Sequence, residues 1–76
     1  MEHTRLTVTL RSGHGVLARL AATLNNHHVL DLTYSETPAD TATAVVRVTR
    51  PDALRARHKL RRLVDVIEVT EVTEGG

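Results

Sequence analysis

A glycine-rich turn at residues 12–15 separates two segments with different hydrophobic periods. The segment before it, residues 4–11, alternates between apolar and polar side chains, which predicts a half-buried strand. The segment after it begins at Val16 and has the apolar spacing of a helix that packs one stripe on a core. The residues of that stripe are Val16, Leu17, Leu20, Ala21 and Leu24. We expect the helix to end near Asn25 and Asn26, which tolerate left-handed geometry at a helix C-terminus.

The turn places glycines at the start of this helix. Gly13 and Gly15 flank His14, and glycine lets the backbone adopt conformations closed to other residues and approach a small ligand closely. The first N–H groups of a helix lack partners within the helix, and the helix dipole is positive there. This geometry favours a carboxylate or a phosphate group. The glycines also suit a purely structural connection, and neither a Walker loop nor a dinucleotide-binding fingerprint is present.

The middle of the chain predicts a β-hairpin. Residues 28–36 alternate, with Leu30, Leu32 and Tyr34 on one face and Val29, Asp31 and Thr33 on the other. Residues 37–40 form a turn that proline initiates, and residues 41–49 alternate again. Two strands joined by so short a turn pair in antiparallel fashion.

The last third of the chain predicts a second helix and a fourth strand. Pro51 and Asp52 suit the first turn of a helix. Its apolar stripe comprises Ala53, Ala56, Leu60, Leu63 and Val64. The strand, residues 66–72, has apolar residues on both faces, with Ile67 and Val69 on one and Val66 and Val72 on the other.

The order strand, helix, strand, strand, helix, strand predicts a ferredoxin-like βαββαβ sandwich of the α+β class. One four-stranded antiparallel sheet would carry both helices on one face. The other face, rich in threonine and with Val29 and Val45, would stay open to solvent or to a partner. We expect a single domain over residues 1–76, with a core at about 5–72 and a tail at 73–76. A chain this short buries only about 60% of its unfolded surface, so oligomerisation would help it.

Composition excludes several classes of protein. The chain has no cysteine, which excludes disulfides, thiolate zinc sites and a cysteine nucleophile. Its formal net charge of +1 creates no strong field that would draw it to nucleic acid or to an anionic membrane. It has no apolar run of the roughly 20 residues that span a bilayer, and no signal-peptide pattern at its start. We therefore expect a cytoplasmic protein that needs no cofactor.

Five histidines raise the question of a metal site or a catalytic site. His14, His27 and His28 could meet across a dimer, but neighbours in a strand point to opposite sides, so His27 and His28 cannot both reach one ion. We interpret these histidines as surface or interface residues and expect no metal. His14 or His28 with Asp31 is the best catalytic pair, but one tyrosine cannot supply the deep aromatic-lined cavity that such a site needs. We expect no catalytic residue and no enzyme activity.

The second helix carries a basic surface opposite its apolar stripe, formed by Arg55, Arg57, Lys59, Arg61 and Arg62. RNA-binding proteins of this fold stack bases on aromatic side chains of the sheet, and none is placed there here. A basic helix face is more commonly solvated or docked on an acidic partner. We expect no nucleic acid, and expect a partner protein on the open sheet face or on Arg55, Arg57, Arg61 and Arg62.

Two motifs resemble those of a known family. Residues 14–20, His-Gly-Val-Leu-Ala-Arg-Leu, resemble the Pro-Gly-Val-Leu-Ala-Arg-Val turn and helix start of the ACT domain, a small-molecule-sensing module attached to many amino-acid metabolic enzymes. Residues 59–69 resemble the helix-to-strand junction of acetolactate synthase small (regulatory) subunits. The resemblance extends from about residue 5 to residue 72.

The resemblance implies a homodimer formed through sheet edges and helices, with an effector amino acid bound at the interface. The first turn of one subunit would bind the effector carboxylate, and the second strand of the other would receive the amino group and side chain. The implied effector-binding residues are Ser12, Gly13, His14, Gly15, Val16, Leu17, His28, Val29 and Leu30. This chain has Ser12, His14 and His28 where the family commonly has Asn, Pro and Asn. If His28 lies near His14 across the interface, histidine protonation would make binding pH-sensitive.

The resemblance therefore implies a stand-alone regulatory subunit that modulates a larger catalytic subunit. That subunit would be acetolactate synthase, in branched-chain amino-acid biosynthesis, with valine, leucine or isoleucine as effector. The alternative is a ferredoxin-like scaffold or protein-interaction module that binds no amino acid.

Overall fold

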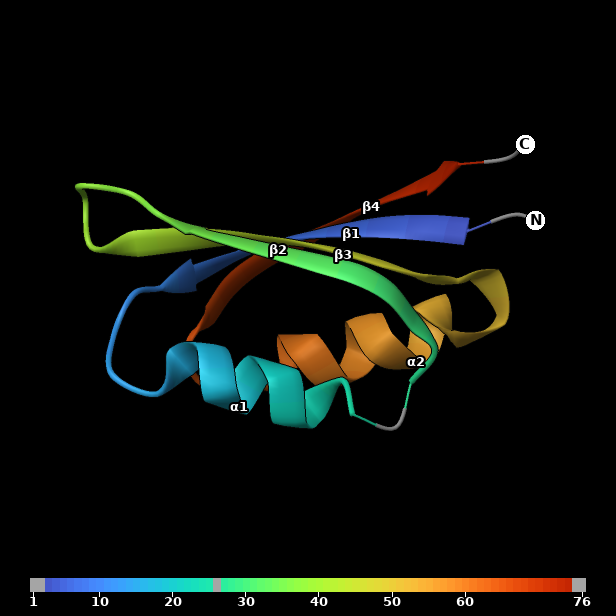
Figure 1. The fold of residues 1–76 in the computed structure, drawn as a ribbon, viewed down its shortest axis with the longest axis horizontal. Coiled ribbons are helices and arrows are strands. Elements are labelled where there is room, and N and C mark those ends of the chain that lie inside the picture. The colour runs from blue at the N-terminus through green and yellow to red at the C-terminus, as the bar shows by residue number, and fades with distance from the viewer. Residues whose placement is uncertain (1–2, 26, 75–76) are drawn as a thin grey trace.

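Four strands and two helices follow one another along the chain in the order that the sequence predicts. The computed structural model describes residues 3–25 and 27–74. Its elements are β1 (His3–Arg11), α1 (Val16–Thr23), β2 (Val29–Glu36), β3 (Thr41–Thr49), α2 (Arg50–Arg61) and β4 (Val66–Glu74). The strands form one antiparallel sheet in the order β2-β3-β1-β4, and both helices lie on the same face of it (Figure 1). The ferredoxin-like α+β fold is thus confirmed.

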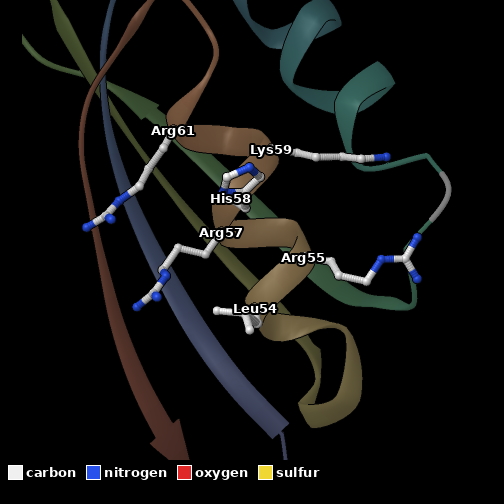
Figure 2. Close-up of a pocket in the computed structure, with 6 residues that line it drawn as sticks. All are labelled: Leu54, Arg55, Arg57, His58, Lys59 and Arg61. Atoms are coloured by element: carbon white, nitrogen blue, oxygen red, sulfur yellow. The ribbon is translucent and has the colours of Figure 1, made fainter.

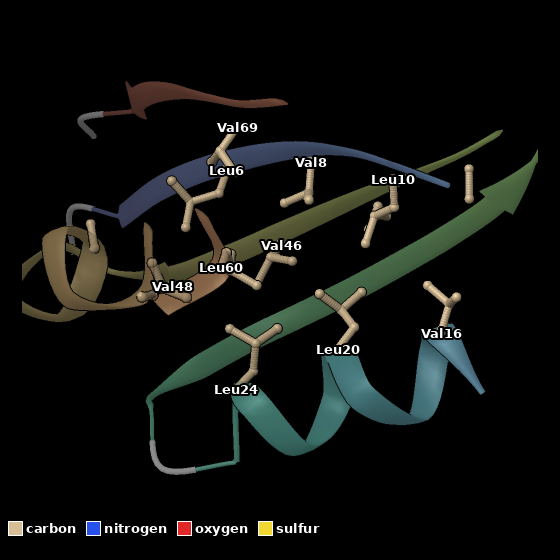
Figure 3. Close-up of a cluster of buried hydrophobic side chains, with 14 residues drawn as sticks. Leu6, Val8, Leu10, Val16, Leu20, Leu24, Val46, Val48, Leu60 and Val69 are labelled. Atoms are coloured by element: carbon tan, nitrogen blue, oxygen red, sulfur yellow. The ribbon is translucent and has the colours of Figure 1, made fainter. Parts of the chain in front are cut away.

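The core lies between the helices and the two central strands, β1 and β3. Residues opposite each other in an antiparallel pair point to the same face, and Leu6 lies opposite Val46. Leu20 of α1 and Leu60 of α2 pack onto this face and are fully buried (Figure 3). The other buried apolar residues are Val8, Leu10, Val16, Leu24, Ala42, Ala44, Val48, Ala53, Ala56 and Val69. The opposite face of β1 and β3 carries Thr7, Thr9, Thr41, Thr43 and Thr49, as expected, whereas Thr4 lies opposite Val48 on the core face and is buried.

The helix α1 is shorter than predicted. It begins at Val16, as predicted, but ends at Thr23, and the next residue, Leu24, keeps right-handed geometry. Asn25 has no positive φ, so the left-handed C-terminus expected there is not found; Asn26 lies outside the described residues. Leu24 is buried in the core, and the N–H groups of Leu24 and Asn25 close the last turn by donating to the carbonyl oxygens of Leu20 and Ala22 at 3.2 and 3.3 Å.

A register shift in β2 overturns one prediction about its faces. Val29 lies opposite Val48 and Asp31 lies opposite Arg47, so Leu30 is an extra residue in the ladder. An extra residue reverses the alternation on either side of it. Val29 therefore packs against the core, while Leu30 is 51% exposed. The prediction that Leu30 shares a face with Leu32 and Tyr34, and that Val29 lies on the open face, was wrong.

A second register shift corrects the prediction for β4. Leu10 pairs with Val66 and Thr9 with Glu68, which leaves Ile67 as the extra residue. Val66 and Val69 both pack on the core, whereas Ile67 and Val72 are about half exposed. Neither of the two predicted pairs shares a face. The strand continues through Glu74, and Gly75 and Gly76, expected to be part of a tail, lie outside the described residues.

The helix α2 has the predicted start and a different end. Pro51 and Asp52 lie in its first turn, and its last residue is Arg61. Leu63 still packs against the core, but Val64 is 86% exposed, because the chain has left the helix before it reaches Val64. Neither α1 nor α2 combines the length and the apolar character of a membrane-spanning helix.

Two leucines of α2 give a matched test of this core. Leu60 is fully buried and Leu54 is 66% exposed. We expect Leu60→Ala to lower the free energy of unfolding by about 2–5 kcal/mol, because it removes buried methyl groups and leaves a cavity. Leu54→Ala should change it by less than about 0.5 kcal/mol. Urea unfolding followed by circular dichroism measures both, and equal effects would contradict the packing described here.

Candidate functional site

The predicted effector loop lies where three connections of the chain meet. The N–H of Arg11 donates to the carbonyl oxygen of Asp65 at 2.8 Å, and the N–H of Ser12 donates to the carbonyl oxygen of Asp40 at 3.0 Å. These bonds hold the turn against the β2–β3 turn and the α2–β4 connection. The Ser12 hydroxyl donates to Oε2 of Glu36 at 3.0 Å. The backbone of the loop is therefore positioned by neighbours that lie far from it in the sequence.

Gly15 is the residue of the loop that must be glycine. Its φ is +79°, in the left-handed region, and it precedes the first residue of α1. A Cβ added there would also lie 3.3 Å from Nη1 of Arg19. At Gly13 an added Cβ would meet only Cγ2 of Val16 at 3.6 Å, an ordinary contact. Gly13 is thus free of the constraint that holds Gly15.

The N-terminus of α1 is open to an anion. No side chain caps it, and its first turn contains no acidic residue. The N–H of Val16 donates to Gly13 at 3.3 Å, which leaves the next N–H groups of the first turn without partners in the helix. The guanidinium of Arg19 lies beside Gly15 and adds positive charge, although its Nε and Nη2 donate to one oxygen of Asp65 at 2.9 and 2.6 Å. Such a site can bind a carboxylate.

The two halves of the predicted effector site lie apart within one chain. Residues 12–17 lie at the start of α1, and residues 28–30 follow its other end (Figure 1). The eight residues of α1 separate them by about 12 Å. His14, Leu17, His28 and Leu30 are exposed, Val29 is half-buried, and the side chain of Val16 is buried in the core.

Asp52 forms an arrangement with His27 and His28 that the sequence reasoning missed. Its Oδ2 accepts the N–H of His28 at 3.0 Å and lies 3.2 Å from the His28 Nδ1. Its Oδ1 lies 4.0 Å from Nδ1 of His27. The His28 N–H bond, helped by the nearby histidines and Arg55, holds the pKa of Asp52 below its ordinary value although partial desolvation opposes this. The N–H of Thr49 also donates to the carbonyl of His28 at 3.1 Å, so the start of β2 is tied to the start of α2.

This arrangement corrects the prediction for the histidines. The side chain of His27 is fully buried, and neither ring nitrogen has a hydrogen-bond partner among the described residues. It is thus no surface residue. Both histidines precede β2, so the alternation of neighbouring side chains along a strand does not apply to them. Both rings therefore approach the carboxylate of Asp52. The Thr-x-x-Asp spacing at the start of α2 is a sequence signal that could have singled out Asp52.

In the described part of the chain, the side chains considered for a metal site or a catalytic site are not grouped into one. No group of three histidine or carboxylate side chains there is placed to hold a metal ion. His14 and His28 lie at opposite ends of α1. The guanidinium of Arg47 binds the carboxylate of Asp31 and lowers its pKa, so Asp31 is engaged in an ion pair on the sheet.

Three of the four predicted partner residues, Arg55, Arg57 and Arg61, line a hollow on the outer side of α2. This α2 hollow has a volume of about 420 Å³ and is lined by Leu54, Arg55, Arg57, His58, Lys59 and Arg61 (Figure 2). Arg62 follows the helix and does not line it. The sequence analysis singled out the arginines but not Leu54 or His58, whose spacing of four residues places them one turn apart on the same face.

Comparison with known proteins bears on the fold. No family model and no curated protein matches this sequence. Among solved structures, the ACT domain of a GTP pyrophosphokinase from Chlorobium tepidum is similar with a TM-score of 0.78 and 9% identity, over 93% of this chain and 86% of that one. The chain has the ACT-domain fold.

Two other structures with this ACT fold are regulatory subunits. The acetolactate synthase small subunit from Thermotoga maritima is similar with a TM-score of 0.77 and 22% identity, over 93% of this chain. The ligand-free regulatory subunit of aspartate kinase from Thermus thermophilus has a TM-score of 0.78 and 14% identity, over the same share. This chain covers 47% and 50% of those two proteins. At these identities the likeness concerns the fold, which confirms the ACT topology that the motifs at residues 14–20 and 59–69 suggested.

The two glycines of the turn provide a paired test of its backbone. We expect Gly15→Ala to destabilise the chain by about 1–2 kcal/mol, because alanine is strained at positive φ. Gly13→Ala should be close to neutral, since its added methyl group makes an ordinary contact. Thermal unfolding of the two variants measures the difference. Equal loss of stability in both would contradict the conformation of Gly15.

The contact between Asp52 and His28 predicts a pH dependence of stability. Because the folded-state pKa of Asp52 is lowered, its contribution is complete above the ordinary aspartate pKa of about 4 and is lost as pH falls through the lowered value. We expect Asp52→Asn to lower the melting temperature near neutral pH. The difference in melting temperature from the unmodified chain should narrow as the pH falls below the ordinary aspartate pKa of about 4. Asp40→Asn, at an exposed carboxyl in a turn, is the control, and a difference that stays constant with pH would refute the prediction.

Proposed function

We propose that this chain is a non-catalytic, cytoplasmic regulatory module that binds an amino-acid effector between two copies of itself and modulates a partner enzyme. The observation that carries the proposal is the uncapped start of α1, where the left-handed Gly15 leaves N–H groups open and Arg19 adds positive charge. A carboxylate is the anion that every amino acid presents. The ACT fold, shared with two regulatory subunits, supports the same assignment.

The separation of the two predicted halves of the site within one chain supports a site shared between two copies. The turn at residues 12–17 would bind the effector carboxylate, and residues 28–30 of the other subunit would receive the amino group and side chain. Each of the outer strands, β2 and β4, has one edge that no strand of this chain covers. A second copy can pair at such an edge, because its backbone N–H and C=O groups lack partners there.

For the enzyme and effector we propose acetolactate synthase and valine, leucine or isoleucine. The support is the sequence resemblance at residues 59–69 and the fold shared with an acetolactate synthase small subunit. Regulation would be a coupling free energy of about 1–3 kcal/mol between effector binding and the arrangement that contacts the enzyme.

One observation favours the alternative, a scaffold that senses no amino acid. The Ser12 hydroxyl is bound to the carboxylate of Glu36, which places a negative charge beside the turn. That charge would repel an incoming carboxylate. In the scaffold, pairing of sheets between copies would itself be the function.

Calorimetric titration of the purified chain with each standard amino acid distinguishes the two functions. We expect one aliphatic amino acid to release or absorb heat and to raise the melting temperature. Arg19→Gln should weaken that binding, because it removes the positive charge beside Gly15, whereas the exposed Arg11→Gln should not. The absence of any heat from a folded dimer would leave the scaffold as the function, and a monomer by ultracentrifugation would contradict the shared site.

A further inference from the structure

The outer face of α2 has a definite layout. Leu54 and His58 lie one turn apart along the middle of the exposed face (Figure 2). Arg57 and Arg61 extend to one side of them, and Arg55 and Lys59 extend to the other (Figure 2). A leucine that is 66% exposed is thus flanked on both sides by cations.

Few carboxylates of the described residues lie close to the outer face of α2. Arg57 is bound by Glu71 of β4 at 3.0 Å. Asp52, the one acidic residue of α2, is turned toward His28. Within the described residues no carboxylate lies within ion-pair distance of Lys59 or Arg61. Because like charges four residues apart destabilise a helix, the Arg55–Lys59 and Arg57–Arg61 spacings favour the approach of an external anion.

The shape of the hollow indicates what kind of anion fits. All six lining residues belong to a single helix and span about two turns, or roughly 10 Å. One helix cannot enclose a small molecule, but its side-chain rows can receive a segment of another protein. An apolar side chain of that segment would pack on Leu54. Carboxylates on either side of that apolar side chain would pair with the flanking cations.

Two other occupants fit less well. A second copy of the chain would bring the same cations face to face, which charge repulsion disfavours. A nucleic-acid backbone would place phosphates over Leu54 and beside the carboxylate of Glu71. An acidic protein segment can place an apolar side chain on Leu54 and its carboxylates at Arg55, Lys59 and Arg61, none of which is bound by Glu71.

We propose that the α2 hollow is the docking surface for an acidic, amphipathic segment of the enzyme that this module regulates. Carboxylates of that segment pair with Arg55, Lys59 and Arg61, and an apolar side chain packs on Leu54. This inference rests on the proposed function, because it specifies the chemistry of the segment by which the regulated enzyme would bind. The proposed docking surface includes fewer arginines than the partner contact predicted from sequence. Arg57 already binds Glu71, and Arg62 lies outside the hollow.

Fluorescence anisotropy of a labelled synthetic peptide tests the proposal on the full chain. The probe is a helical peptide with glutamates on both sides of a leucine stripe, and its control has glutamine at each glutamate. We expect the acidic peptide to bind at low salt and to dissociate at about 0.5 M salt, because screening weakens the ion pairs. The glutamine peptide should not bind.

Variants of the chain locate the contact. The double variant Lys59→Glu with Arg61→Glu should weaken peptide binding by about tenfold or more. Leu54→Ser should weaken it several-fold, and Arg11→Glu, which lies on the sheet, should leave it unchanged. Because the altered residues are exposed, circular dichroism should show each variant folded.

Three outcomes would overturn the proposal: no binding of the acidic peptide, equal binding of the glutamine peptide, or tighter binding of a single-stranded oligonucleotide that the same double variant abolishes. The amino-acid titration separates this failure from failure of the proposed function. A chain that binds an amino acid but no peptide refutes the docking surface alone. A chain that binds the peptide but no amino acid refutes sensing alone.

Discussion

Burial of aliphatic side chains between the two helices and the central strands determines where everything else in this molecule lies. The chain has no phenylalanine or tryptophan, so leucine and valine form the core. Alanines at Ala42 and Ala44 of β3 and at Ala53 and Ala56 of α2 are small enough to let the helices approach the sheet closely. That close packing fixes both ends of each helix, and with them the loops that carry the polar chemistry.

The two polar centres of the molecule lie at opposite ends of α1 for this reason. At one end the turn of Ser12–Gly15 is tied to Asp40 and Asp65, and at the other His27 and His28 approach Asp52. Each centre joins segments that are remote in the sequence. The backbone carbonyls of Asp40 and Asp65 and the carboxylate of Glu36 hold the turn, and the carboxylate of Asp52 holds the start of β2. The helix between them acts as a spacer that keeps the two centres about 12 Å apart.

The sequence predicted the fold wherever a regular period was unbroken. The alternation in β1 and β3 gave the correct faces, because buried strands repeat their pattern at a fixed interval. In the stripe predicted for the first helix, Val16, Leu20 and Leu24 are buried, whereas Leu17 and Ala21 are exposed. The failures at Leu30 and Ile67 have one cause: an extra residue in a ladder is decided by the neighbouring strand, and an apolar residue at that position looks like part of the core. The burial of His27 and its approach to Asp52 depend on how α2 packs beside the start of β2. That information is tertiary, and the five-residue connection between α1 and β2 is too short to show a period from which to infer it.

The irregularities at Leu30 and Ile67 also affect how the sheet can grow. Each lies near the beginning of an outer strand, where the extra residue increases the local twist and interrupts the even spacing of backbone N–H and C=O groups. A foreign strand that uses such an edge as a template loses its ladder at that point. The same two insertions that turn Val29 and Val66 inward therefore confine any regular pairing with another chain to the parts of β2 and β4 that follow Leu30 and Ile67.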